Sequence, residues 1–185
     1  MAMKRFPLEQ YATLELNQVA FPKTGMVVSQ TPLGSEFTAA APCENGMWVL
    51  ADKSKGTIGS AANVTDTPIG IVYTAEKEYD MYHYGLKTFG RKVEGDYPRV
   101  GILGLGDTVT TNCLQYDDVD FATEAELYAA LEAFATTPVY VALVAGSPVP
   151  KLTTSKPGSG IYGKVTKFYT VPNGEKGVKY EIVSL

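Results

Sequence analysis

The sequence predicts a mainly β protein: a compact sandwich or barrel with one short α-helix, an extended N-terminal arm and a C-terminal β-hairpin. Short apolar segments alternate with turn residues over most of the chain, as in sandwiches and barrels. One segment alone has the spacing of an amphipathic helix. The last 25 residues alternate apolar and polar side chains around a glycine-containing turn. With 185 residues, the chain is long enough to bury a core without disulfides or metals.

The first 24 residues are interpreted as an extended arm. Apolar residues are isolated here and follow neither a period of 2 nor one of 3.6, and Pro7 and Pro22 lie near the two ends. We expect the arm to lie on a protein surface, either this domain's or a neighbouring subunit's. A short strand at 13–16 is the alternative.

Residues 25–145 are predicted to form the β domain. Asn45-Gly46 and the Gly-Leu-Gly-Asp sequence at 104–107 provide turns between apolar segments, and a further buried strand is expected at 139–145. The other expected strands share a length of three to six residues and lie at 26–28, 37–41, 47–51, 69–73, 100–105 and 108–111.

One helix is predicted within this domain, at 124–135. Thr123 is the expected N-cap, and Glu126 is placed to reach back to the backbone before the helix. Apolar residues recur at i, i+4 and i+7 on one face, namely Leu127, Leu131 and Phe134.

The C-terminal region divides into a predicted linker and a predicted hairpin. Residues 146–160 contain three prolines, three glycines and three serines, a composition typical of loops and linkers. Residues 161–185 are expected to form a hairpin, because apolar side chains at 178, 180 and 182 alternate with charged ones. An isolated hairpin is marginal in water, so it must join a sheet of this chain or of a neighbour.

Composition excludes several classes of function. Sixteen basic and twenty acidic residues give a net charge of −4, so no nucleic-acid partner is expected. Cys43 and Cys113 lack metal-ligand spacing and His83 is the single histidine; we expect no metal or cofactor, and free thiols in preference to a disulfide. The longest apolar run, 139–145, is too short to cross a membrane, and residues 1–10 lack a signal peptide. Synthesis in the cytoplasm without membrane association is therefore expected.

No motif points to catalysis. The glycines at 101–106 are followed by a β-like segment and not by the helix that a dinucleotide site requires. The three aspartates within 117–120 are interpreted as a solvated acidic turn before the helix and not as a calcium site. We therefore expect a protein that is not an enzyme, although a carboxylate pair among the twenty acidic residues stays open as a minor alternative.

Tyrosine is concentrated in one segment. Five of the twelve tyrosines lie between Tyr73 and Tyr97, and tyrosine is enriched at protein interfaces. An interface loop around Tyr79, Tyr82 and Tyr84 is the preferred interpretation. The alternatives are a hairpin packed on the domain's own sheet and a platform that stacks on sugars.

A family resemblance extends over residues 25–115. The stretches ENGMWVLAD (44–52), TPIGIVYTAEKEYD (67–80), PRVG (98–101) and GDTVTTN (106–112) together resemble structural proteins of tailed-bacteriophage heads. The resemblance implies a head decoration (cement) protein or a minor capsid component, and it brings no catalytic residues.

The functional hypothesis is a non-enzymatic virion protein that binds the outer surface of the capsid and stabilises it. Its expected partners are the major capsid protein and copies of itself, as a homo-oligomer on the lattice. A carbohydrate-binding β-sandwich, in which Trp48 and the tyrosines form the stacking platform, is the alternative, although Trp48 is itself predicted to lie in the core; a tail or head-fibre component is another. The expected interface residues are Phe6, Leu8, Tyr11, Tyr79, Tyr82 and Tyr84.

Overall fold

The computed structural model describes residues 3–8, 12–15, 19–20, 26–28, 30–74, 92–170 and 174–185. The elements in chain order are β1 (Met3–Arg5), β2 (Val27–Val28), β3 (Trp48–Leu50), the 3-10 helix η2 (Lys53–Lys55), β4 (Ile69–Val72), β5 (Val100–Ile102), β6 (Thr108–Thr111), β7 (Gln115–Asp117), α2 (Glu124–Glu132), β8 (Tyr140–Val144), β9 (Ser147–Thr153), β10 (Tyr162–Thr170) and β11 (Lys176–Ser184).

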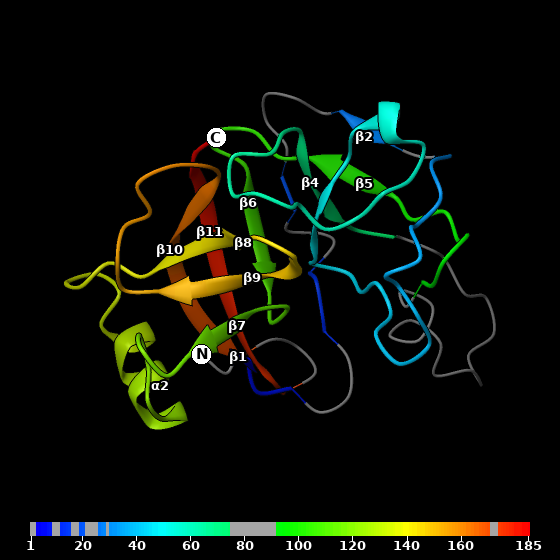
Figure 1. The fold of residues 1–185 in the computed structure, drawn as a ribbon. Helices are drawn as coiled ribbons and strands as arrows, with labels where there is room; N and C mark the ends of the chain where they lie inside the picture. The colour runs from blue at the N-terminus through cyan, green and yellow to red at the C-terminus, as the bar shows by residue number, and fades with distance from the viewer. Residues whose placement is uncertain are drawn as a thin grey trace.

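The strands form two sheets. A large sheet has the order β1-β7-β9-β8-β10-β11-β6, and a small sheet has the order β2-β5-β4-β3. Figure 1 shows the two sheets in separate halves of the molecule, with α2 beside the large sheet. The predicted mainly β architecture is confirmed, as a sandwich-like arrangement and not a closed barrel. The helix is too short to span a membrane, as is every other helix in the described ranges.

The small sheet is buried on both faces. Trp48 and Leu50 point into the core shared with the large sheet, whereas Val49 between them packs into a second cluster on the opposite face. This alternation follows from the two-residue period of a strand. Trp48 has no exposed surface, and its indole nitrogen donates a hydrogen bond of 2.9 Å to the hydroxyl of Tyr180 on β11. The prediction that Trp48 lies in the core is confirmed.

The segment 37–41 is not the strand that its apolar residues predicted. The backbone groups of Thr38 and Ala41 bond to each other in a tight turn. Phe37 is 2% exposed and packs with Met47 against the outer face of the small sheet. The segment 37–41 is apolar because it is a loop whose Phe37 side chain covers the small sheet.

The described residues of the N-terminal segment lie on the chain's own large sheet, one of the two surfaces expected for the arm. β1 pairs antiparallel with β7, and the amide of Phe6 donates to the carbonyl of Leu114. Further along, Leu14 and Ala20 form bridges with β6 at the opposite end of the strand order. β1 is therefore one end strand of the chain's own large sheet, and Leu14 and Ala20 lie against β6, the other end strand.

The prediction of a linker at 146–160 is wrong for its first half, because Ser147–Thr153 is strand β9. β9 pairs with β8 along most of its length and touches β7 in parallel. Its prolines, Pro148 and Pro150, lie where the register with β8 is irregular. Such positions tolerate a residue without an N–H group. The prolines therefore indicated a linker although the segment forms a strand.

The predicted C-terminal hairpin is confirmed, and it joins the chain's own sheet. β10 and β11 pair antiparallel, β10 continues onto β8, and β11 pairs with β6. Val178, Tyr180 and Ile182 lie in the shared core. The C-terminal hairpin and the β domain therefore share one hydrophobic core.

The predicted helix is present as α2, with the expected cap. The Thr123 hydroxyl accepts a hydrogen bond from the amide of Glu126, and the Glu126 carboxylate accepts one from the amide of Ala122. The helix ends at Glu132 and not near Ala135; turns continue over 133–136.

Candidate functional site

The predicted anchor residues on the arm are not free to bind a partner in the way we expected. Phe6 has no exposed surface and packs edge-on against the ring of Tyr128. Leu8 is half-buried against the second apolar cluster. Phe6 is therefore a core residue of this chain. The other predicted interface residues, Tyr11, Tyr79, Tyr82 and Tyr84, lie outside the described residues.

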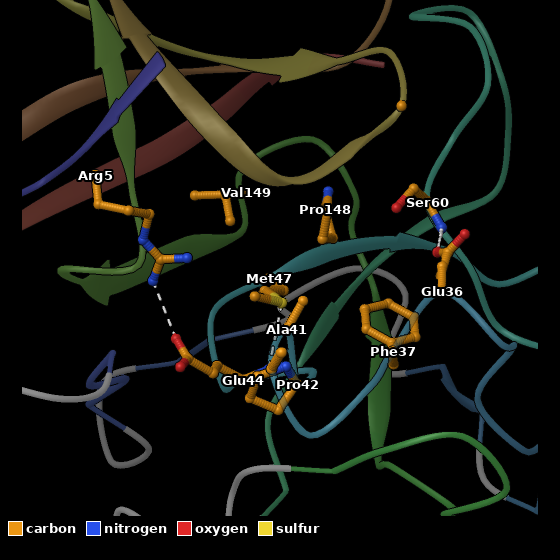
Figure 2. Close-up of a pocket in the computed structure, with 12 residues that line it drawn as sticks. Arg5, Glu36, Phe37, Ala41, Pro42, Glu44, Met47, Ser60, Pro148 and Val149 are labelled. Carbon is orange, nitrogen blue, oxygen red and sulfur yellow. Dashed lines mark hydrogen bonds and ion pairs between the residues drawn. The ribbon is translucent and has the colours of Figure 1, made fainter. Parts of the chain in front are cut away.

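A pocket of about 540 Å³ lies where β1, the 36–47 loop and the β8–β9 turn meet. Figure 2 shows apolar side chains of the loop facing the hollow, among them Phe37 and Met47. The Arg5 guanidinium lies 3.0 Å from the Glu44 carboxylate on one side. Glu36 accepts a hydrogen bond from the backbone amide of Ser60 on the other.

The charged side chains of this pocket form ion pairs and hydrogen bonds with other segments of the same chain. Glu44 is 12% exposed and also accepts from the amide of Ala12, so it ties the N-terminal segment to the small sheet. The hollow has the size of a small-molecule site. In this structure, however, the charged side chains that line it are engaged in contacts between segments of the chain.

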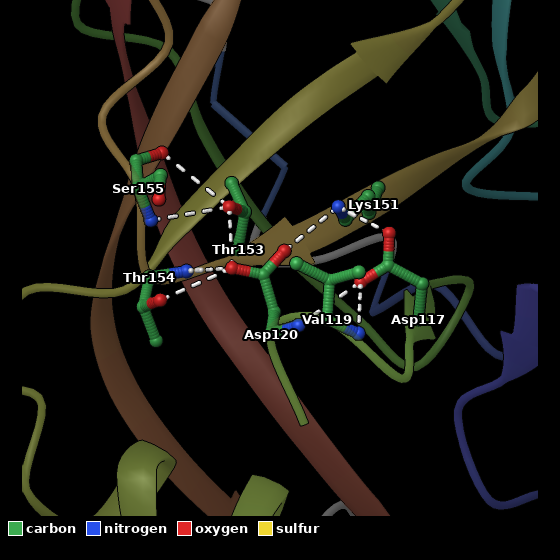
Figure 3. Close-up of polar contacts among 7 residues, drawn as sticks. All are labelled: Asp117, Val119, Asp120, Lys151, Thr153, Thr154 and Ser155. Carbon is green, nitrogen blue, oxygen red and sulfur yellow. Dashed lines mark hydrogen bonds and ion pairs between the residues drawn. The ribbon is translucent and has the colours of Figure 1, made fainter. Parts of the chain in front are cut away.

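A lysine lies between two buried carboxylates at the end of β7. The ammonium of Lys151 on β9 is 2.6 Å from Asp117 and 2.7 Å from Asp120 (Figure 3). The side chains of Asp117 and Asp120 are 4% and 7% exposed. Asp120 also accepts hydrogen bonds from Thr153 and Thr154. The interpretation of 117–120 as a solvated turn is therefore wrong for these two aspartates.

The pKa shifts in this network show that all three groups are charged near neutral pH. Burial alone raises the pKa of Asp117 and Asp120, but the hydrogen bonds from Lys151 and from neighbouring backbone or threonine groups outweigh it, so both pKa values lie below normal. Burial alone lowers the pKa of Lys151, but its two carboxylate partners raise it on balance. The network is an ion cluster that connects β7 to β9.

Both cysteines are buried free thiols, as predicted. Burial raises the pKa of Cys113 to about 12 and that of Cys43 even further. Since the thiolate is the reactive form of cysteine, neither side chain is prepared for nucleophilic chemistry near neutral pH.

An accessible strand surface lies on the C-terminal hairpin. β10 pairs with β8 only from Tyr162 to Lys164, and Val165 donates to the carbonyl of Val139. From Thr166 to Thr170, no strand of the described chain pairs with the side of β10 that faces away from β11. We call residues 166–170 the hairpin edge.

The hairpin edge combines aromatic and basic side chains. Phe168 is half-buried and stacks on Tyr128 of α2 with ring centroids 5.6 Å apart, so the edge is attached to the helix. Lys167 lies over the ring of Tyr169 at 5.5 Å, and Lys176 lies over Phe168 at 5.6 Å. Aromatic residues are enriched at protein interfaces, and a cation over a ring is attracted by its π electrons.

Sequence reasoning predicted the hairpin, with the possibility of strand addition, but missed the basic, aromatic character of its edge and the Lys151 network. Within the described ranges, no three His, Cys, Asp or Glu side chains are grouped to hold a metal ion. Searches against protein-family models, curated proteins and solved structures found no match. The lysines at 164, 167, 176 and 179 were the sequence signal that could have indicated the basic charge of the hairpin.

Proposed function

We propose that this chain is a non-enzymatic structural protein of a bacteriophage particle, which binds the outer surface of the capsid and stabilises it. The observation that carries the proposal is the hairpin edge. It is an accessible strand margin within the large sheet, whose end strands are β1 and β6. β1 belongs to the N-terminal segment, and Leu14 and Ala20 of the same segment form bridges with β6. Open strand edges pair readily with other chains.

The remaining chemistry of the described residues supports a structural role. Lys151, Asp117 and Asp120 are bound to one another, and the two thiols are buried. A decoration protein bound in many copies also gains firm attachment from weak single contacts.

The structure weighs against the carbohydrate-binding alternative. Trp48 was one of its proposed stacking residues, but this side chain is fully buried and hydrogen-bonded to Tyr180. The tyrosines at 79, 82 and 84, the other part of that platform, lie outside the described residues. A sugar cannot reach the indole without opening the core.

Quantitative peptide mass spectrometry of gradient-purified particles tests the proposal. We expect this chain to co-sediment with the major capsid protein in a fixed, high copy ratio that survives repeated purification. Its absence from the particles, or a ratio that falls with each gradient, would refute a capsid role. Particles produced without the protein should also release their DNA at a lower temperature than complete particles.

A further inference from the structure

We propose that the hairpin edge binds an extended acidic segment of a partner protein as an additional β strand. The inference rests on the proposed function only for the source of that segment, which would be a coat subunit. The binding surface and the acidic character of the partner follow from the residues of the hairpin alone.

The backbone geometry of β10 allows strand addition. Thr166, Lys167 and Thr170 are exposed, and Phe168 holds this stretch against α2. β11 fixes the other side of the stretch through pairs from Lys167–Lys179 to Thr170–Lys176. A strand that is held on one side and open on the other offers a preformed row of backbone donors and acceptors.

The positive charge of the hairpin favours a negatively charged partner segment. Residues 162–184 contain four lysines and two glutamates, whereas the rest of the chain contains 12 basic and 18 acidic residues. The hairpin is thus a basic element on an acidic protein. Among the described residues, no carboxylate lies within 4 Å of the ammonium groups of Lys164, Lys167, Lys176 or Lys179.

These lysines, which have no carboxylate partner in the described part of the chain, favour an acidic strand over a second copy of this chain. Two hairpin edges paired with each other would bring two basic hairpins close together, and clustering of like charges is destabilising. Lysine on an edge strand is a common means of preventing self-association. An acidic segment would instead place carboxylates beside Lys167 and Lys176 while its backbone bonds to β10.

The test uses two fluorescein-labelled peptides, one of alternating glutamate and valine and one of alternating lysine and valine. Fluorescence anisotropy at low ionic strength should show binding of the full-length protein to the acidic peptide and not to the basic one. Amide hydrogen exchange should show new protection at 166–170. Binding that leaves these amides unprotected would overturn strand addition, as would equal binding of both peptides.

A backbone-methylated acidic peptide separates strand pairing from simple charge attraction. It keeps every carboxylate but loses N–H donors, so we expect its binding to be lost. If it binds as well as the unmodified peptide, the edge does not act as a strand acceptor.

A charge-reversal variant tests the role of the lysines. Lys167→Glu combined with Lys176→Glu should weaken binding of the acidic peptide about tenfold. Lys156→Glu, on an exposed loop away from the hairpin, is the matched control and should change binding little. Thermal unfolding of both variants checks that the fold is kept; equal loss in the folded control would refute the assignment to the hairpin.

The two proposals can fail separately. Peptide binding without the protein in purified particles would retain the acidic-strand site and refute the capsid role. A fixed copy ratio in particles without peptide binding would retain the capsid role and refute this site.

Discussion

Replacing Lys151 with methionine should strongly destabilise the fold. Methionine keeps much of the lysine stem but removes the cation between Asp117 and Asp120, whose side chains are 4% and 7% exposed. Two buried carboxylates would then face each other without a counter-charge.

The size of the effect follows from this burial. Removing one partner of a buried ion pair costs about 3–5 kcal/mol. Lys151 is 22% exposed, and Asp120 keeps its bonds from Thr153 and Thr154. Water and these donors would partly compensate the carboxylates, so we expect a loss of about 2–4 kcal/mol in the free energy of unfolding.

The variant should also reverse the dependence of stability on pH. In the wild-type protein the pKa values of Asp117 and Asp120 are lowered. Their contribution is therefore complete above the unfolded pKa of about 3.9 and is lost as the pH falls through the folded pKa. Without Lys151, burial dominates and raises both pKa values above the unfolded value. The folded variant then binds more protons than the unfolded chain, so it should gain stability as the pH falls from 7 towards 5.

Urea unfolding at pH 7 and pH 5 measures both effects. Trp48 is the only tryptophan and is fully buried, so its fluorescence reports the loss of the core. Lys156→Met, which removes an exposed lysine, is the control and should change stability by less than about 0.5 kcal/mol. A loss below about 1 kcal/mol for Lys151→Met, or a pH response like that of the wild type, would refute the reasoning.

Three further predictions concern the core. Tyr180→Phe removes the acceptor of the buried Trp48 indole N–H and should cost about 1–3 kcal/mol in urea unfolding; an unchanged midpoint would show that the bond contributes nothing. Gly46→Ala should destabilise by about 3 kcal/mol, because the new Cβ would lie 2.5 Å from Cys113 Cβ at a φ of +94°. Gly106→Ala, with φ +87° and open space around it, should cost only about 1–2 kcal/mol, and equal losses would contradict the steric argument. Because burial raises the pKa of Cys113 to about 12, both thiols should resist Ellman's reagent at pH 8 until urea unfolds the chain; rapid reaction of the folded protein would contradict it.

The sequence by itself determined the elements whose signals are local. Thr123 and Glu126 lie three residues apart, so the helix cap could be recognised from the chain alone. The hairpin at 161–185 was equally visible, because strand alternation and a glycine turn lie within one short segment. The core position of Trp48 followed from its place in an apolar segment.

Features that depend on distant parts of the chain were decided only by the tertiary structure. Lys151 and Asp117 are 34 residues apart, and nothing near either residue indicates that the other will neutralise it. β9 was hidden by its prolines, because the irregular pairing with β8 that tolerates them exists only in the assembled sheet.

The same reason accounts for the N-terminal segment and for the candidate site. Isolated apolar residues such as Phe6 show that a segment must be covered, but they do not show which chain covers it; here the cover is the chain's own core. The hairpin edge likewise arises because β8 pairs with only part of β10. An open edge is a property of the finished sheet, since local sequence sets the tendency to form a strand but not the neighbours that each strand acquires.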